Sequence, residues 1–187
     1  MPNTGVPWYS HLVPTTPQFQ KKNPKATIFT KFGKIEIRFF TDLAPRHVEN
    51  FINLVKLKFY DGTTFHRIVP DFIIQGGDPL SKDPNRELHG TGGPGYSIPA
   101  EPNDRPHRRG TFSMAKVPRS VETTRDVSDN GSQFFICVED SSGLDRVYSA
   151  FGKVVRGMDV VDQIVAQPRD DRDNPLEPIE MTITVEE

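Results

Sequence analysis

Apolar and polar residues alternate in the first regular segment of the chain, which begins near Ala26. Ile35, Ile37 and Phe39 alternate with charged residues at 34, 36 and 38, so one face of this segment is hydrophobic. A period of two is typical of a half-buried β-strand. The pattern therefore predicts a strand that ends at about Phe39.

After this strand the apolar residues adopt the spacing of a helix. Pro45 suits a first helical turn, and Asp42 offers a side chain for the N-cap. One face of the segment then carries the apolar residues Val48, Phe51, Ile52 and Val55. These features predict a helix from about Pro45 to Lys58.

The rest of the chain reads as short strands, with one more helix. Runs rich in β-branched and aromatic residues between turn signals predict strands at 63–68, 72–75, 111–114, 133–138 and 149–155. Apolar spacing predicts a second helix at 158–166, and alternation from Ile179 to Val185 predicts a final strand. Many short strands with only two helices favour a β-barrel or sandwich over a βαβ array.

The segment that precedes the first strand has a different composition. Five of its first 24 residues are proline, and it shows little periodicity. Proline lacks a backbone donor, so regular structure is not expected there. We predict a proline-rich tail at 1–24 and one domain at 25–187. A further hypothesis is that X-Pro pairs of the tail reach a binding groove of the same chain or of another copy.

Composition narrows the class of protein. A chain of 187 residues with 35% hydrophobic and 26% charged residues fits a single globular domain. It contains no apolar run of the roughly 20 residues that a membrane-spanning helix needs, and its N-terminus does not resemble a secretory signal. The net charge of −2 argues against nucleic acid and anionic membranes as partners. With Cys137 as the single cysteine, we expect a cytoplasmic protein.

Most signatures of catalytic or cofactor sites can be rejected. The segment 90–95 matches G-x-G-x-x-G, but Pro94 and the following residues do not open a helix, so a loop is the better interpretation. The five histidines include no His-x-x-x-His pair, and no G-x-S-x-G elbow is present. Cys137 lies in an apolar run and is expected to be an inert thiol. We therefore expect no metal, no cofactor and no nucleophilic catalysis.

Two segments of the chain are individually unusual and together resemble one family. Phe65–Asp78 reads FHRIVPDFIIQGGD, and Asn130–Ile136 reads NGSQFFI. Both resemble the hallmark segments of cyclophilins and occur in the family's order. Shorter matches, including the Gly90–Gly93 and Phe151–Val154 segments, extend the resemblance over about residues 25–185. It implies a mainly-β fold: a closed eight-stranded antiparallel barrel with a helix over each open end.

The resemblance implies a peptidyl-prolyl cis/trans isomerase, and elementary chemistry is compatible with its residue types. Rotation about a prolyl amide is opposed by a barrier of about 18–20 kcal/mol, because twisting destroys the amide resonance. A catalyst needs only a site that binds the twisted amide better than either planar isomer. Accelerating the exchange from tens of seconds to milliseconds requires roughly 5–6 kcal/mol. A fixed guanidinium in apolar surroundings can contribute to this stabilisation.

The resemblance also assigns roles to individual residues of this sequence. Arg67 matches the catalytic arginine, with Gln75 placed to orient it. Proline-pocket residues of the family match Phe72, Ile73, Phe135 and Leu144, and a polar groove residue matches Gln133. The edge that accepts the substrate main chain matches Met114, Ala115 and Lys116. Without the resemblance, Arg67 would be interpreted as a solvated strand arginine and the apolar residues as ordinary core. His66 alternates to the other strand face and is expected to be a hydrogen-bonded structural residue.

Three positions depart from the family pattern. Gly143 stands where many eukaryotic members have a tryptophan associated with cyclosporin binding, so we expect weak cyclosporin affinity. Tyr148 replaces a histidine but keeps an aromatic edge, and we expect activity to survive. Residues 118–129 form a long charged and polar stretch, which is expected to be a solvated loop near the groove or a lid over it.

These observations favour an enzyme that acts on accessible X-Pro bonds in peptides and in unfolded or flexible protein segments. The alternative is a binding module or chaperone that captures proline-containing segments without significant turnover. Arg67 and Gln75 favour the enzyme, since pure binding does not require a group that stabilises a twisted amide.

Overall fold

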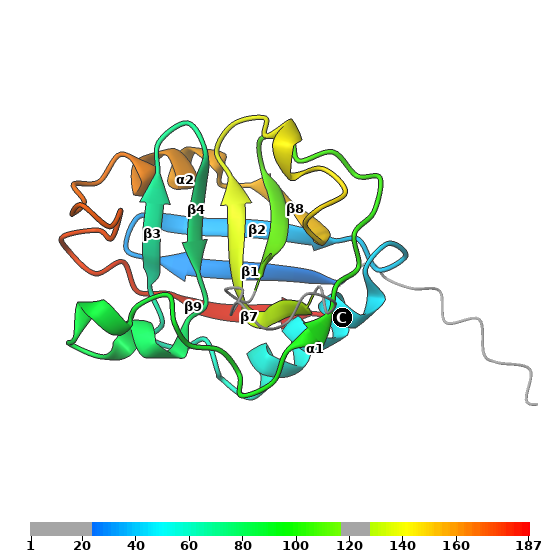
Figure 1. The fold of residues 1–187 in the computed structure, drawn as a ribbon, viewed down its shortest axis with the longest axis horizontal. Coiled ribbons are helices and arrows are strands. Elements are labelled where there is room, and N and C mark those ends of the chain that lie inside the picture. Colours follow the sequence, from blue (N-terminus) through cyan, green and yellow to red (C-terminus); the bar gives the residue numbers. More distant parts are fainter. Residues whose placement is uncertain (1–23, 117–127) are drawn as a thin grey trace, which may run out of the picture.

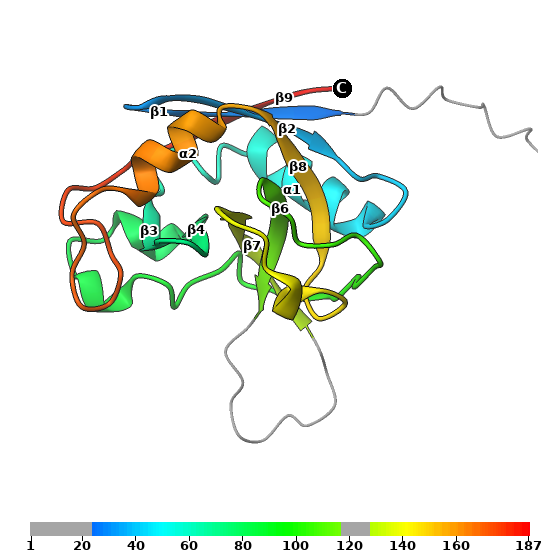
Figure 2. The ribbon, with the colours of Figure 1, turned by 90° about the horizontal axis from the view of Figure 1, so that it is seen from above.

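A single antiparallel sheet runs through the whole protein and curls into a barrel-like shell. The computed structural model describes residues 24–116 and 128–187. Neighbouring strands follow the order β3-β4-β7-β6-β8-β2-β1-β9, with the short β5 paired to β7 outside this path. Figures 1 and 2 show β3, β4 and β7 crossing β1, β2 and β9 in a second layer, with α1 and α2 toward opposite ends.

The strands and helices have the following bounds. The strands are β1 (Lys25–Thr30), β2 (Gly33–Phe39), β3 (Phe65–Val69), β4 (Ile73–Gly76), β5 (Ile98–Pro99), β6 (Thr111–Lys116), β7 (Ser128–Cys137), β8 (Ala150–Arg156) and β9 (Thr182–Glu186). The helices are α1 (Pro45–Lys56) and α2 (Met158–Val165), and 3₁₀ turns occur at Pro79–Lys82, Arg86–Leu88 and Ser142–Leu144. Neither α-helix in this part of the chain is long and apolar enough to cross a membrane.

The ends of the sheet meet through a short stretch of pairing. Thr64 forms a β-bridge with Glu180, and the Phe65 amide donates to the Ile179 carbonyl over 3.0 Å. Eight strands thus follow one another around the shell. The predicted mainly-β fold, an eight-stranded antiparallel barrel with two helices, is confirmed as a curled antiparallel sheet whose ends meet only through this short pairing. The closing contact involves residues just outside β3 and β9, so the closure is much shorter than the other strand pairings.

Aromatic rings fill the interior between the sheet and α1. Phe51 of α1 is fully buried and lies 5.4 Å from the Phe112 ring and 5.8 Å from the Phe134 ring, measured between centroids, in edge-to-face geometry. Phe112 and Phe151 are 4.6 Å apart. The alternating residues of β2, Ile35 and Ile37, are also fully buried. The period-two and helical patterns of the sequence therefore point to the same core.

A buried polar network fixes α1 to the sheet. The His47 side chain is fully buried; its Nδ1 lies 2.5 Å from Glu101 Oε2, and its Nε2 lies 2.7 Å from Asp129 Oδ2. The Ser149 hydroxyl donates to the same Asp129 oxygen over 2.5 Å. Glu101 also accepts from the backbone amides of Arg46 and His47 at the start of the helix. The network connects the first turn of α1 to β7 and to the residue before β8.

Some boundaries differ from those expected from the sequence. Ala44, not Asp42, occupies the N-cap of α1, and the distant Glu101 carboxylate satisfies the first free amides. β7 begins at Ser128, five residues earlier than predicted, so the end of the expected 118–129 loop belongs to a strand. Residues 117–127, and residues 1–23 of the predicted tail at 1–24, lie outside the described residues.

Candidate active site

A row of side chains runs across four neighbouring strands on one face of the sheet. Arg67 of β3 pairs directly with Gln75 of β4, Gln75 pairs with Phe135 of β7, and Phe135 pairs with Ser113 of β6. Directly opposite residues share a face and are neighbours. The register therefore places the predicted arginine, glutamine and phenylalanine next to one another, although they are up to 68 residues apart in sequence.

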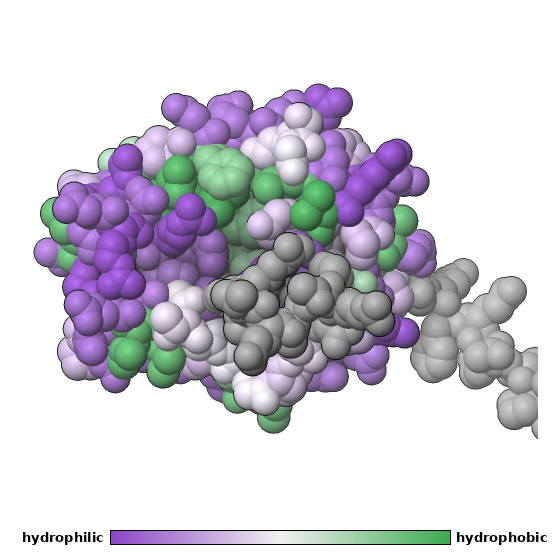
Figure 3. Space-filling model, in the orientation of Figure 1, coloured by the Kyte–Doolittle hydropathy of each residue, from purple (hydrophilic) through white to green (hydrophobic). Residues whose placement is uncertain are grey.

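An apolar cluster adjoins this row and is separate from the main core. Ile73, Phe135 and Cys137 are its buried members, and partly buried apolar residues pack against them: Val69, Phe72, Leu144 and Tyr148. Figure 3 shows hydrophobic residues gathered in a hollow in the upper part of this face, over β4 and β7, with a hydrophilic border. The predicted proline-pocket residues are thus brought together at the surface.

Arg67 is half-buried and its guanidinium is available. No ion pair or side-chain hydrogen bond links it to any residue in the described ranges, including Gln75. Gln75 donates instead from Nε2 to Gln133 Oε1 over 3.0 Å. Gln75 lies opposite Arg67 in the register but forms no hydrogen bond to it, so its predicted role in orienting Arg67 remains a prediction.

The loop that contains Gly90 and Gly92 is held beside this row by Asp78 and Asn130. These residues are the last of the segment Phe65–Asp78 and the first of the segment Asn130–Ile136. Asp78 accepts hydrogen bonds from the amides of Gly90 and Gly92, and Asn130 donates to the Gly92 carbonyl over 3.0 Å. Gln133 Nε2 completes the attachment with bonds to the Gly90 and Gly92 carbonyls. The segment matching G-x-G-x-x-G is a loop, as expected, and its backbone is tied to the polar end of the groove.

The backbone conformation at position 77 requires a glycine before Asp78. The φ of Gly77, +86°, lies in the left-handed region, and a Cβ there would meet the Ser132 carbonyl and the Phe134 ring. Only glycine adopts this conformation readily. It therefore lets the chain turn from β4 toward the carboxylate that anchors the loop.

A buried histidine behind Phe135 was not singled out from the sequence. The His107 ring stacks on Phe135 with centroids 6.1 Å apart, and its Nε2 lies 3.1 Å from the Ser113 hydroxyl. Asp145 accepts from the His107 backbone amide over 2.7 Å and lies 3.2 Å from its Nδ1. These contacts fix the ring of Phe135 from behind. The local signal was weak, because the partners of His107 lie 6 and 38 residues away.

The far edge of the groove contains a strand irregularity and an aromatic side chain. The pairing of β6 with β7 shifts register between Met114 and Lys116. Met114 pairs with Phe134 and Lys116 pairs with Asp129, so the extra residues of this irregularity lie in β7, opposite Ala115. The Lys116 ammonium lies 5.4 Å from the Tyr148 ring centroid, and Tyr148 packs edge-to-face on Phe135. Met114 is a correction: its side chain is fully buried in the main core, because strand alternation turns it inward, so it cannot contact a substrate.

Cys137 lies beneath the apolar cluster. It is fully buried, and burial raises the pKa of its thiol to about 12. The thiolate form needed for nucleophilic attack is therefore suppressed. The thiol is inert, as expected from its position in an apolar run.

His66 is buried beside Arg67 but faces away from it. Its side chain makes no hydrogen bond of normal geometry to a described residue, so the expected hydrogen-bonded role is not observed. Burial lowers its pKa to about 4, and the nearby Asp78 carboxylate offsets this only in part. The ring is therefore neutral at pH 7.

We predict that His66 makes the folded protein less stable in mild acid. Between about pH 6.5, the ordinary histidine pKa, and about pH 4, the unfolded chain binds a proton that the folded chain does not. Stability therefore falls as the pH drops through this window, by about 3 kcal/mol in full. Urea unfolding at pH 7 and pH 4.5 measures the loss.

The control is His66→Leu, which removes the titrating group and keeps a side chain of similar size. The native protein and the variant share every other ionisable group, including His107, whose pKa is also lowered by burial. Their difference in pH dependence therefore isolates His66. An equal loss of stability in both proteins between pH 7 and pH 4.5 would show that His66 titrates normally.

The chain is similar in sequence to proteins of one known family. The family model described as cyclophilin type peptidyl-prolyl cis-trans isomerase/CLD matches residues 25–186. A peptidyl-prolyl cis-trans isomerase of Synechococcus elongatus is 43% identical over 150 residues, covering 76% of this chain and 93% of the relative. Peptidyl-prolyl cis-trans isomerase B of Bacillus subtilis is 41% identical, covering 68% of this chain and 80% of the relative.

A solved structure shares the fold. It is a cyclophilin type peptidyl-prolyl cis-trans isomerase of Cryptosporidium parvum, crystallised in the presence of the dipeptide Ala-Pro. The two chains are 29% identical with a TM-score of 0.76, and the match covers 87% of this chain and 99% of the other. Sequence and fold therefore lead to the same group of proteins.

Proposed function

The chain belongs to the cyclophilin-type peptidyl-prolyl cis-trans isomerase family, and on that premise we propose that Arg67 and the adjoining apolar cluster form its catalytic groove. The observation that carries the proposal is the in-register row of Arg67, Gln75 and Phe135 beside the apolar cluster. A guanidinium that forms no ion pair with any described residue thus borders a hydrophobic hollow.

Most residues of the groove would bind the substrate. Phe72, Ile73, Phe135 and Leu144 would hold the pyrrolidine ring, because an apolar hollow favours a side chain that lacks a polar group. The backbone of Ala115, which has no partner in the register of β6 with β7, would accept the substrate main chain. Lys116 would contribute through its backbone, with Tyr148 as an aromatic edge. Both contacts place the susceptible amide near Arg67.

Catalysis would come from a hydrogen bond that strengthens as the amide twists. Loss of resonance leaves a lone pair on the prolyl nitrogen, which accepts a hydrogen bond poorly while the amide is planar. The Arg67 guanidinium can donate to this nitrogen, and the surrounding apolar groups raise the strength of the bond. Because Arg67 has no competing partner among the described residues, it need not break an ion pair first.

We propose that proline-containing peptides and flexible protein segments are the substrates, in a reducing compartment such as the cytoplasm. The Ala-Pro dipeptide named with the Cryptosporidium structure supports proline recognition in a related groove. The buried, unpaired Cys137 is compatible with a reducing environment.

The test is the rate of cis/trans relaxation of several short X-Pro peptides at about 10 °C, where the uncatalysed process takes minutes. The enzyme hypothesis predicts relaxation that accelerates in proportion to protein concentration. The alternative, a module that binds proline segments without turnover, predicts peptide binding by calorimetry with an unchanged relaxation rate. The second result would remove the catalytic role.

We further propose that cyclosporin binds weakly because the groove lacks an aromatic wall at Gly143. A Cβ at this position would have no atom of the described residues within 4 Å, so space is open for a large side chain. Gly143→Trp should tighten cyclosporin binding by about ten- to a hundredfold. This factor corresponds to the roughly 1.5–3 kcal/mol of free energy gained when a large apolar side chain is buried. Calorimetry on both proteins measures this. A matched Lys31→Trp variant controls for nonspecific stickiness, and unchanged affinity in Gly143→Trp would contradict the explanation.

A further inference from the structure

Three basic residues lie side by side on β1, β2 and β8. The register pairs Arg38 with Lys25 on one side and with Lys153 on the other. All three residues are exposed. Directly opposite like charges destabilise a sheet, so this arrangement is unfavourable without a counter-ion.

Glu186 of β9 lies opposite Lys25 in the register, but no ion pair joins the two, and no described carboxylate lies opposite Arg38 or Lys153. None of the side-chain hydrogen bonds or ion pairs among the described residues involves Lys25, Arg38 or Lys153. Other arginines differ sharply, since each of the following is paired with an aspartate: Arg86, Arg108, Arg109, Arg146 and Arg169. Among the described residues, Arg38 and Lys153 therefore lie side by side without an acidic partner.

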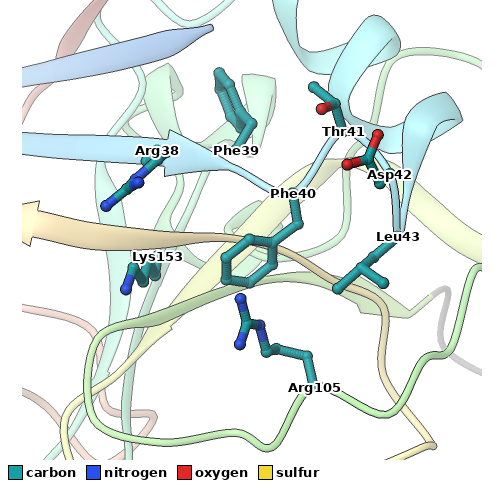
Figure 4. A pocket seen from close by; sticks show the side chains of 8 residues that line it. All are labelled: Arg38, Phe39, Phe40, Thr41, Asp42, Leu43, Arg105 and Lys153. Carbon is teal, nitrogen blue, oxygen red and sulfur yellow. The ribbon is translucent and has the colours of Figure 1, made fainter. Parts of the chain in front are cut away.

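A pocket of about 220 Å³ opens beside this row, where β2 leads into α1. Figure 4 shows the charged ends of Arg38 and Lys153 on one side of the Phe40 ring, with the Arg105 guanidinium against the ring. Arg105 lies 4.5 Å from the ring centroid, which holds it in place. Asp42 also lines the pocket, but its carboxylate points away from Arg38, Arg105 and Lys153.

We propose that this pocket binds the phosphoryl group of a phosphate monoester, with Arg38, Arg105 and Lys153 as its ligands. Three cations and one carboxylate leave a net charge of +2 in the lining, which matches a phosphate monoester of about −1.5 to −2 at pH 7. Guanidinium groups also match phosphate oxygens in geometry. A single carboxylate ligand would leave the row largely unneutralised.

The pocket is distinct from the isomerase groove. Its residues lie on β2, β8 and the segments before α1 and β6, and none belongs to the apolar cluster around Phe135. The proposal therefore does not depend on the catalytic role of Arg67. Since the family acts on polypeptides, a phosphoserine side chain is the source of the phosphoryl group that we test first, with inorganic phosphate as the other source.

The experiment titrates the full chain with a fluorescent peptide that contains phosphoserine but no proline, so that the groove is not engaged. The unphosphorylated peptide and inorganic phosphate are the other probes. We expect saturable binding of the phosphopeptide, weakened at least tenfold in the Arg38→Gln, Lys153→Gln double variant and by added salt. An Arg108→Gln, Arg169→Gln variant removes the same charge elsewhere and should bind as the native protein does.

A thermal measurement checks the same site without a peptide. Neutralising Arg38 and Lys153 should raise the melting temperature in low salt, because like-charge repulsion is relieved. Phosphate should then raise the melting temperature of the native protein more than that of the double variant, compared at equal ionic strength with chloride.

The outcomes separate the possible sources. Binding of inorganic phosphate without the phosphopeptide supports the site and assigns it to the free ion. The proposal is overturned if neither probe binds, if the serine and phosphoserine peptides bind equally, or if the double variant, shown to be folded by circular dichroism, binds both probes as the native protein does.

Discussion

Replacing Arg67 with alanine is expected to lower kcat/KM for isomerisation of an Ala-Pro peptide by about 100- to 1,000-fold, the usual cost of removing one preorganised donor. The loss should fall on kcat, because the hydrogen bond to the prolyl nitrogen forms only as the amide twists. Peptide affinity should change little, since the apolar cluster remains. Progress curves at several peptide concentrations give both parameters.

Two variants sharpen this prediction. Arg67→Lys keeps the charge but loses the planar array of donors, so it should recover only a minor part of the activity. Arg169→Ala removes an exposed arginine that pairs with Asp173, and it should leave activity unchanged. A folded Arg67→Ala protein with native kcat/KM would exclude the guanidinium from catalysis.

The second large effect is expected from His47→Ala, which should lower the free energy of unfolding by about 3–5 kcal/mol. His47 is the neighbour of both Glu101 and Asp129, and the side chain of Asp129 is fully buried. Removing the imidazole takes from Asp129 its hydrogen-bond partner on the helix, and it leaves Glu101 with only the backbone amides of residues 46 and 47. Urea unfolding at pH 7, followed by circular dichroism, measures the loss.

A double variant tests whether the buried Asp129 side chain, left without its partner on the helix, accounts for the loss of stability. His47→Leu with Asp129→Asn removes the ring and the buried charge together, and it should be more stable than His47→Ala alone. In the native protein the Ser149 hydroxyl donates to the Asp129 carboxylate. In the double variant it can donate to the amide oxygen of the asparagine instead. A loss below about 1 kcal/mol in His47→Ala would show that the network contributes little.

The sequence patterns predicted the elements better than the contacts between them. Alternation in β2 and the apolar face of α1 were sufficient, because both depend on neighbours within a few residues. The start of α1 at Pro45 was predicted correctly, but its N-cap was misassigned to Asp42, since the first amides bond to Glu101, which lies 54 residues beyond His47. The early start of β7 depends on its pairing with β5 and β6, which local propensity does not reveal.

The candidate site shows the same division. Resemblance identified Arg67, Gln75 and Phe135, and the strand register places them in one row. Met114 was misassigned because a motif gives the position of a residue but not the face it occupies. His107 was missed since its role depends on stacking behind a residue of another strand. The basic pocket beside β2 also arises only when β1, β2 and β8 are aligned.

Exchange spectroscopy of one Ala-Pro peptide with a small fraction of the native protein tests the central claim most directly. The proton spectrum resolves the cis and trans forms, whose uncatalysed exchange takes tens of seconds or more. We predict cross-peaks between the two forms on the subsecond timescale with the native protein, and none with Arg67→Ala at equal peptide occupancy. Line broadening from binding without cross-peaks in the native sample would contradict the account, and the groove would then be a site of capture alone.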